Sequence, residues 1–197
     1  MISVRLPGSD DRDRLRSWRN RDAVRAVSLD QDPVPAEEHE AWFERLQQYR
    51  QGQLGIVCHD QRPVGVVQLT QLDVPKSQAT WGCHLGEVDV PPGFGATLPI
   101  LGIALGLRGW GLTLLDAEVI ETNKNMLGIH RRLAIRRTKP TGSAGEQAGA
   151  AGPATIRFQV SDGEFSAILE RAERLFPSAL SESLTSAVVA LDSWRDR

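Results

Sequence analysis

The sequence predicts an α/β domain whose mixed, mostly antiparallel sheet is flanked by helices. The stretch from Ala79 to Leu133 has the pattern of a strand, a glycine-containing loop, an apolar helix, a second strand and an amphipathic helix. Before it, Leu54 to His59 and Val64 to Leu72 alternate like strands and are joined by a turn, so they form a meander with the strand at Ala79. Beyond Ser161, apolar residues recur at helical spacing and predict a C-terminal helical pair.

The length of 197 residues, with 41% hydrophobic residues, suits one globular domain with a sizeable core. We expect the sheet and its covering helices in residues 1–160. Residues 161–197 are expected to form a helical extension that packs on the same domain.

Charge and composition exclude several classes of partner. The formal net charge of −2 argues against nucleic acid, because duplex binding normally needs a basic surface. No apolar run reaches the roughly 20 residues of a membrane span, and the N-terminus has no signal-peptide core, so we expect a cytoplasmic protein without a membrane partner. Cys58 and Cys83 are expected to be small buried thiols, and the scattered His residues give no metal site.

The N-terminal region predicts a strand and two helices. Ile2 to Leu6 alternates, and Asp10 or Asp11 then caps a helix. A second helix begins at Pro35, which suits a first helical position. The inward-facing residues of the two helices are expected to be Leu15, Trp18, Trp42, Phe43 and Leu46.

The apolar helix after the glycine loop is expected to begin near Phe94. Its first turn would present free backbone N–H groups to an anion, and Gly93 and Gly95 would allow a phosphate to approach closely, although a simple tight turn is the alternative. With that start, Pro99 lies just past the first turn, where it removes one hydrogen bond and favours a kink.

The C-terminal third begins with a short strand at 136–139, followed by a small-residue, flexible segment at 141–154. Thr155 to Val160 alternates and is expected to pair back as a strand. Ser161 with Glu164 is a capping-box pattern that opens a helix, and another helix follows Pro177.

The run EVIETNKNMLGIHRRLAI resembles the late motif of the GNAT superfamily of acetyl-CoA-dependent N-acetyltransferases. The resemblance implies that Asn123 helps to hold coenzyme A and that His130 takes the place of the tyrosine that protonates the departing thiolate. The family's phosphate loop corresponds to 90–95, where both glycines are kept but the polar or basic first residue is Val90. The cofactor contacts implied by the resemblance are Leu85, Gly93, Phe94, Gly95, Ala96 and Asn123.

Strand alternation places Thr80, Gly82 and His84 on one face of the strand that begins at Ala79. His84 is therefore a possible general base, with a carboxylate or a water as the alternative in this superfamily. The resemblance also implies that this strand separates from its parallel neighbour at 112–120, that coenzyme A lies between them, and that backbone groups near Leu85 polarise the thioester carbonyl.

Trp18-Arg19-Asn20, Glu38-His39 with Trp42-Phe43, and Trp81-Gly82 resemble the branch that acetylates amino groups of nucleotide-linked amino sugars. The branches that act on protein N-termini or polyamines share this outline less closely. An arginine suits a phosphate or carboxylate on the acceptor. The substrate candidates are Arg19, Asn20, His39, Trp42 and Trp81, against the alternative that they are core or surface residues.

The resulting hypothesis is direct acetyl transfer from acetyl-CoA to a small-molecule primary amine. No metal is implied, and a homodimer is a possible assembly through one apolar stripe of the C-terminal helices. The rival hypothesis is a non-catalytic scaffold or binding protein of the same shape, because Val90, the paired prolines, Pro99 and the ending Leu133-Ala134-Ile135 depart from the family pattern.

Overall fold

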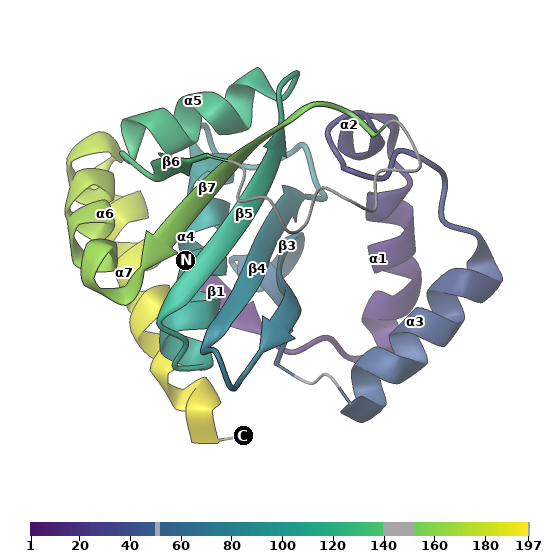
Figure 1. Cartoon of the computed structure of the whole chain (residues 1–197). Coiled ribbons are helices and arrows are strands. Elements are labelled where there is room, and N and C mark those ends of the chain that lie inside the picture. The colour runs from purple at the N-terminus through teal and green to yellow at the C-terminus, as the bar shows by residue number, and fades with distance from the viewer. Residues whose placement is uncertain (50–51, 140–151, 197) are drawn as a thin grey trace.

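The computed structural model describes residues 1–49, 52–139 and 152–196. A seven-stranded sheet with the order β1-β2-β3-β4-β5-β7-β6 crosses the molecule (Figure 1). Among the described strands, β4 and β5 are parallel and the other neighbours are antiparallel, which confirms the predicted fold class. The strands are β1 Ile2–Arg5, β2 Leu54–His59, β3 Arg62–Asp73, β4 Gln78–Leu85, β5 Leu114–Ile120, β6 Arg136–Thr138 and β7 Thr155–Ser161.

Helices cover both faces of the sheet (Figure 1). The helices are α1 Arg12–Arg19, α2 Asp22–Arg25, α3 Ala36–Tyr49, α4 Leu98–Ala104, α5 Lys124–Arg132, α6 Asp162–Leu175 and α7 Ser178–Ala190. Short 3-10 segments occur at Ser9–Asp11, Phe94–Ala96 and Leu191–Asp196, and a π-helical turn at Leu105–Gly109 continues α4. Among the residues that the structure describes, no helix is long and apolar enough to cross a membrane.

Two hydrophobic cores lie on opposite sides of the sheet. The larger one packs α4, α6 and α7 against the sheet, and the smaller one packs α1 and α3 against β2 and β3. The predicted inward residues Leu15, Trp18, Phe43 and Leu46 are all buried in the smaller core, whereas Trp42 is half-buried at its edge.

Helix α4 differs from the sequence prediction at its start. A 3-10 turn at Phe94–Ala96 precedes it, so Pro99 falls in the first positions of the helix, where its missing N–H would have no partner within the helix. The predicted interruption is therefore wrong. A Cβ added to Gly102 would lie 3.2 Å from the Trp81 ring, and one added to Gly106 would lie 2.6 Å from Leu115. These glycines let the helix pack directly on the sheet.

The strands β4 and β5 separate toward their C-terminal ends. They pair from Gln78–Leu114 to Thr80–Asp116, and within the described residues no further pair joins them, although β4 runs on to Leu85. The chain just after β4 is held by α1, because the Trp18 indole N–H donates to Glu87 at 2.7 Å. The predicted separation between the two parallel strands is thus present.

The C-terminal helices pack against the sheet and α4. The Ser161 backbone N–H donates to the Glu164 carboxylate at 2.8 Å, which confirms the predicted capping box at the start of α6. Helix α7 contacts β1 and α4. Most of the flexible segment predicted at 141–154 lies outside the described residues.

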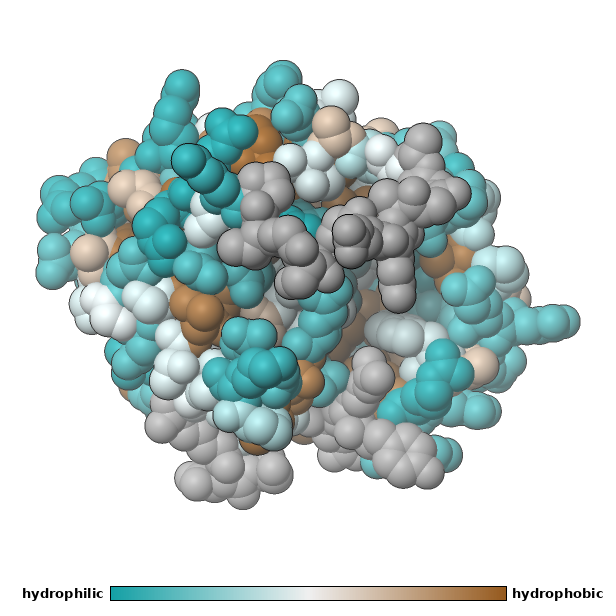
Figure 2. Space-filling model, viewed as in Figure 1, coloured by the Kyte–Doolittle hydropathy of each residue, from teal (hydrophilic) through white to brown (hydrophobic). Residues whose placement is uncertain are grey.

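Seven large apolar side chains are exposed among the described residues. On the face shown in Figure 2, hydrophilic residues predominate and the hydrophobic residues form small separate patches. The most exposed large apolar residues are Met1, Val27, Leu29, Val74, Val88, Leu175 and Val189. The homodimer stays a prediction.

Candidate active site

Two cavities open on either side of the gap between β4 and β5. The first, called here the helix-side cavity, has a volume of about 540 Å³ and lies between α1–α3 and the sheet, with lining residues that include Arg19, Trp42, Gln68 and His84. The second, called here the loop-side cleft, has a volume of about 650 Å³ and lies between the loop at Gly93–Ala96 and α5.

The two cavities share part of their lining. Cys83 and His84 from the end of β4, with Asn123 and Met126 from the start of α5, line both. A molecule bound in the cleft can therefore meet a molecule bound in the cavity at this junction. An acyl-transfer reaction needs such an arrangement, because its two reactants must touch in a fixed orientation.

The loop-side cleft brings together most of the predicted cofactor residues. Leu85, Gly93, Gly95 and Ala96 line it, and Gly93 takes the left-handed conformation with φ of 85°. Phe94 does not line it, because its side chain is fully buried and meets the ring of His59 edge-on at 5.3 Å. A ligand in the cleft would reach Phe94 only through its backbone.

Asn123, which lines both cavities, has a clear structural task. Its side-chain oxygen accepts a hydrogen bond from the Met126 backbone N–H at 3.0 Å and so caps α5. Capping alone accounts for an asparagine at this position. Its lining of both cavities is an additional property.

Positive charge in the cleft comes from residues that the sequence analysis did not assign. Lys124, Arg131 and Arg132 on α5 line the cleft beside the glycine loop. Val90, which stands where the family loop carries a polar or basic residue, instead packs against the larger core. The sequence shows that Arg131 and Arg132 are adjacent, but it does not show that they line the cleft. Their place in the lining follows from the position of α5 opposite the loop.

Two glycines of the cleft are not required by the packing of the protein. A Cβ added to Gly128, inside α5, would meet no other atom within 4 Å, and one added to Gly95 would come no closer than 3.9 Å to Leu85. Neither has a positive φ. Since a glycine inside a helix costs roughly 1 kcal/mol relative to alanine, the open space beside Gly128 fits a ligand that approaches the backbone closely.

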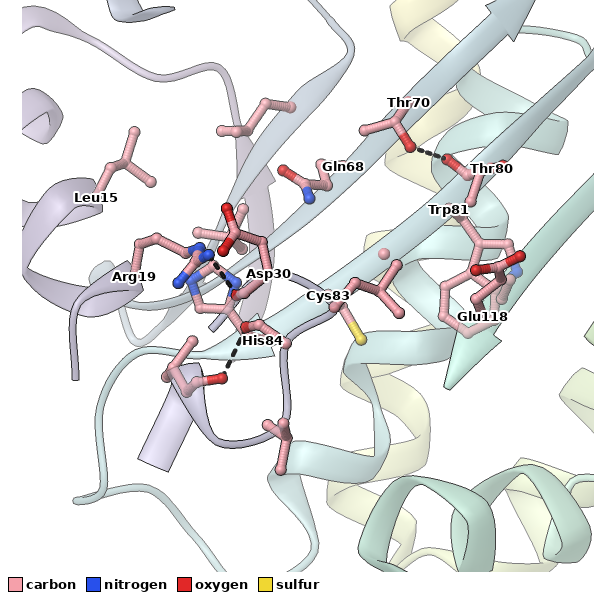
Figure 3. A pocket seen from close by; sticks show the side chains of 18 of the residues that line it. Leu15, Arg19, Asp30, Gln68, Thr70, Thr80, Trp81, Cys83, His84 and Glu118 are labelled. Atoms are coloured by element: carbon pink, nitrogen blue, oxygen red, sulfur yellow. Dashed lines mark hydrogen bonds between the residues drawn. The ribbon is translucent and has the colours of Figure 1, made fainter. Parts of the chain in front are cut away.

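The floor of the helix-side cavity is formed by side chains from one face of the sheet. Gln68 and Thr70 of β3 pair across from Gly82 and Thr80 of β4, and Figure 3 shows Gln68, Thr70 and Thr80 beside the same space. The predicted shared face of Thr80, Gly82 and His84 is confirmed, because the alternate residues of β4 pack against the larger core on the other face of the sheet. Trp81 and Cys83 also reach the cavity, on the side where β4 and β5 part.

The predicted substrate residues divide into two groups. Arg19, His39, Trp42 and Trp81 line the helix-side cavity. Asn20 does not, because its amide donates to the Val34 carbonyl at 3.0 Å and accepts from the Val34 N–H at 2.7 Å, which fixes the loop before α3. His39 is buried, and its Nε2 lies 2.7 Å from the Arg12 carbonyl, so it also joins α3 to α1.

Buried nitrogen atoms without partners concentrate in the helix-side cavity. In the described part of the chain, the buried side-chain nitrogen and oxygen atoms that lack a hydrogen-bond partner all belong to residues that line it. They are Arg19 Nη1, Trp81 Nε1, His84 Nε2, His130 Nδ1 and His130 Nε2. Unpaired buried polar atoms are costly, so their gathering in one cavity marks a place for a polar ligand or for water.

Two of the three histidines that line the cavity, His84 and His130, are neutral at neutral pH. Burial, and secondly the charge of Arg19, lower the pKa of His84 to about 4. Burial alone lowers the pKa of His130 to about 4. His130 is therefore a neutral imidazole near neutrality, and the role that the resemblance implies for it, protonation of the departing thiolate, stays a prediction. A neutral imidazole still donates one N–H hydrogen bond and accepts another.

Cys83 lies at the junction but is not an activated nucleophile. Burial raises the pKa of its thiol to about 12, and a thiol is nucleophilic only as the thiolate. Both cysteines are free. Within the described ranges, no group of three or more His, Cys, Asp or Glu side chains could hold a metal ion.

Comparison with known proteins finds likeness in structure alone. No protein-family model matches the chain, and no curated protein matches it in sequence. The spermidine N-acetyltransferase of Vibrio cholerae, solved with CoA and spermine, is similar with a TM-score of 0.70 at 12% identity, over 84% of this chain and 98% of that one.

Two further solved structures are similar over most of the chain. The N-acetyltransferase PseH of Campylobacter jejuni, solved with acetyl coenzyme A, has a TM-score of 0.57 at 14% identity, over 82% of this chain and 99% of that one. The ribosomal-protein-alanine N-acetyltransferase of Brucella melitensis has a TM-score of 0.60 at 16% identity, over 80% and 98%. The chain therefore has the fold of the GNAT N-acetyltransferases.

Proposed function

We propose that this protein is an acetyl-CoA-dependent N-acetyltransferase that transfers the acetyl group directly to a primary amine of a small acceptor. The observation that carries this proposal is the meeting of two cavities at Cys83, His84, Asn123 and Met126, in the gap between β4 and β5. Acetyl-CoA binds in the loop-side cleft, and the acceptor amine binds in the helix-side cavity.

The loop-side cleft suits the cofactor in shape and charge. Gly95 and Gly128 leave room beside the backbone, and Asn123 stands at the junction. Val90 carries no charge that could bind the phosphate groups of the cofactor. Lys124, Arg131 and Arg132 supply this positive charge instead. Acetyl-CoA, when bound, supplies an acyl group activated as a thioester.

The residues at the junction support direct transfer. Backbone N–H groups of β4 near Leu85, where none of the described strands pairs on the β5 side, stabilise negative charge on the carbonyl oxygen. His84 remains unprotonated because its pKa is lowered, so the imidazole accepts a hydrogen bond from the attacking amine. The amine nitrogen forms the new bond to the carbonyl carbon, the carbon–sulfur bond breaks, and the proton that the nitrogen loses ends on the departing sulfur, so the products are the amide and the thiol of CoA. His130, as a neutral N–H donor, stabilises the departing sulfur.

The acceptor we favour is an amino sugar, free or linked to a nucleotide. Gln68, Thr70 and Thr80 on the cavity floor are suited to sugar hydroxyl groups, and Trp42 and Trp81 offer apolar ring surfaces. Protein N-termini and polyamines are the competing acceptors, given the similar structures.

Two measurements test the proposed function. Calorimetry should detect binding of CoA, and Gly95→Asp should abolish it by placing a carboxylate beside the phosphates. An assay of free thiol with acetyl-CoA and a panel of amines should then show turnover. If the wild-type protein neither binds CoA nor gains thermal stability from it at millimolar concentration, the scaffold hypothesis replaces the enzyme.

A further inference from the structure

Arg19 enters the helix-side cavity from the last turn of α1. Its Nη2 donates to the backbone carbonyl of Asp30 at 2.7 Å, and this bond turns the guanidinium toward His84 (Figure 3). Its Nη1 is buried and has no hydrogen-bond partner. One side of a rigid donor group is thus held in place while the other side faces the cavity without an acceptor.

The charge of Arg19 is not balanced by a carboxylate. None of the ion pairs among the described residues includes Arg19, whereas Arg5, Arg14 and Arg21 each have one. Three acids line the same cavity, Asp30, Glu38 and Glu118, and none of them forms an ion pair with Arg19 among the described residues. The Asp30 carboxylate accepts from the Asp32 backbone N–H at 2.9 Å, and Glu118 pairs with Arg157 at 2.7 Å.

The unpaired guanidinium lies close to the proposed reaction centre. Its charge acts on His84, which lines both cavities and whose Nε2 also lacks a partner. A group bound by Arg19 would therefore lie only a few bonds from an amine placed at the junction. Arg19 is half-buried, but its buried Nη1 lacks an acceptor, and an incoming anion would supply one.

We propose that the acceptor carries an anionic group, a carboxylate or a phosphate, close to its amine, and that Arg19 binds this group. This inference rests on the proposed function and narrows its substrate class. The guanidinium fork matches the paired oxygens of either anion, and an acceptor without an anion leaves the fork unpaired. Amino acids and phosphorylated amino sugars fit this requirement, and polyamines, which carry only positive charge, do not.

The inference can be tested by binding alone, without a catalytic assay, with amines that differ in whether they carry an anionic group. The probes are glucosamine 6-phosphate against glucosamine, alanine against alaninamide, and spermidine, each titrated by calorimetry into the protein with and without CoA. At least one anionic probe should bind about tenfold more tightly than its neutral partner, since a charge-assisted hydrogen bond is lost in the neutral compound. The pair that shows the difference identifies phosphate or carboxylate as the anion.

Variants separate anion binding from support of the loop. Arg19→Gln should remove the tighter binding of the anionic probe over its neutral partner, and Arg19→Lys should keep part of this difference. The matched control is Arg25→Gln, because Arg25 Nε donates to the Gln31 carbonyl at 2.9 Å, in the same loop, but does not line the cavity. This control should keep the full preference. Thermal unfolding of each variant checks that it is folded.

Several results would overturn the inference. The inference fails if anionic and neutral partners bind equally, or if neither anionic probe binds at millimolar concentration. It also fails if spermidine binds more tightly than the anionic probes, or if Arg19→Gln still prefers the anionic probe. Failure of the proposed function looks different. In that case CoA does not bind or acetyl-CoA gives no turnover, while the anion preference and its loss in Arg19→Gln remain.

Discussion

The ring of His130 meets the ring of Phe158 at right angles, with centroids 4.4 Å apart. On another side the ring of Trp81 lies 5.3 Å away, and His130 is fully buried. This apolar setting disfavours the charged imidazole, which is why the pKa of His130 falls to about 4 from its ordinary 6.5. A position that the sequence assigns to an acid is thus occupied by a neutral donor.

The first prediction concerns the pH dependence of stability. The unfolded chain binds a proton on His130 below pH 6.5 while the folded one does not until about pH 4. The stabilisation is therefore complete above pH 6.5 and is lost as pH falls toward 4. Between pH 7 and pH 5 this single group should lower the free energy of unfolding by about 2 kcal/mol.

Urea unfolding at both pH values, on the wild type and on His130→Phe, measures this effect. The phenylalanine variant removes the titrating group and keeps a ring in the core. In His130→Phe the loss of unfolding free energy between pH 7 and pH 5 should be smaller than in the wild type by about 2 kcal/mol. An unchanged loss would mean that the imidazole is protonated in the folded protein.

The second prediction concerns the role of His130 in catalysis. His130→Ala should lower kcat about tenfold or more with little change in acetyl-CoA binding, because the departing sulfur loses a hydrogen-bond donor. His130→Tyr should recover part of the loss. Steady-state kinetics on both variants provide the measurement. An alanine variant within about twofold of the wild type in kcat would show that His130 only fills the core.

The limits of the sequence can be seen on single helices. Arg19 and Asn20 are neighbours at the end of α1, and both are polar, yet one enters the cavity and the other bonds Val34. Their roles depend on the loop at 26–34, which has no periodic pattern. The pKa of His130 likewise depends on burial beside Trp81 and Phe158, which are distant in sequence.

Local signals, by contrast, were sufficient for much of the fold. The Ser161–Glu164 cap and the alternation in β2, β3 and β4 depend on nearby residues only, and they appear where they were expected. The start of α4 was misplaced because a 3-10 turn uses the same kind of residues as a helical turn.

The third prediction concerns the positive edge of the loop-side cleft. Arg131→Gln combined with Arg132→Gln should weaken CoA binding about tenfold, because charge-assisted contacts to phosphate are lost. If these arginines face the 3′-phosphate, the loss should be smaller for 3′-dephospho-CoA. The control is Arg137→Gln, an exposed arginine on β6 that does not line the cleft. Calorimetry with CoA and 3′-dephospho-CoA measures these affinities. If Arg137→Gln weakens CoA binding as much, the loss comes from the overall charge of the protein and not from contacts in the cleft.

The last prediction sets ligand binding against stability at Gly128. This residue lies inside α5 with helical backbone, and a Cβ there would meet no other atom within 4 Å. Gly128→Ala should therefore stabilise the free protein by roughly 0.5–1 kcal/mol, since alanine favours the helix. The same methyl group points into the loop-side cleft, so CoA binding should weaken by about 1 kcal/mol or more, as in other overfilled sites.

Gly163→Ala is the matched control, because Gly163 lies in the first turn of α6, has equally open surroundings and does not line either cavity. It should stabilise the protein without changing the affinity for CoA. Urea unfolding and calorimetry on the two variants give both quantities. A Gly128→Ala variant that gains stability and binds CoA as tightly as the wild type would show that the cofactor does not approach α5, and the assignment of the loop-side cleft to CoA would have to be abandoned.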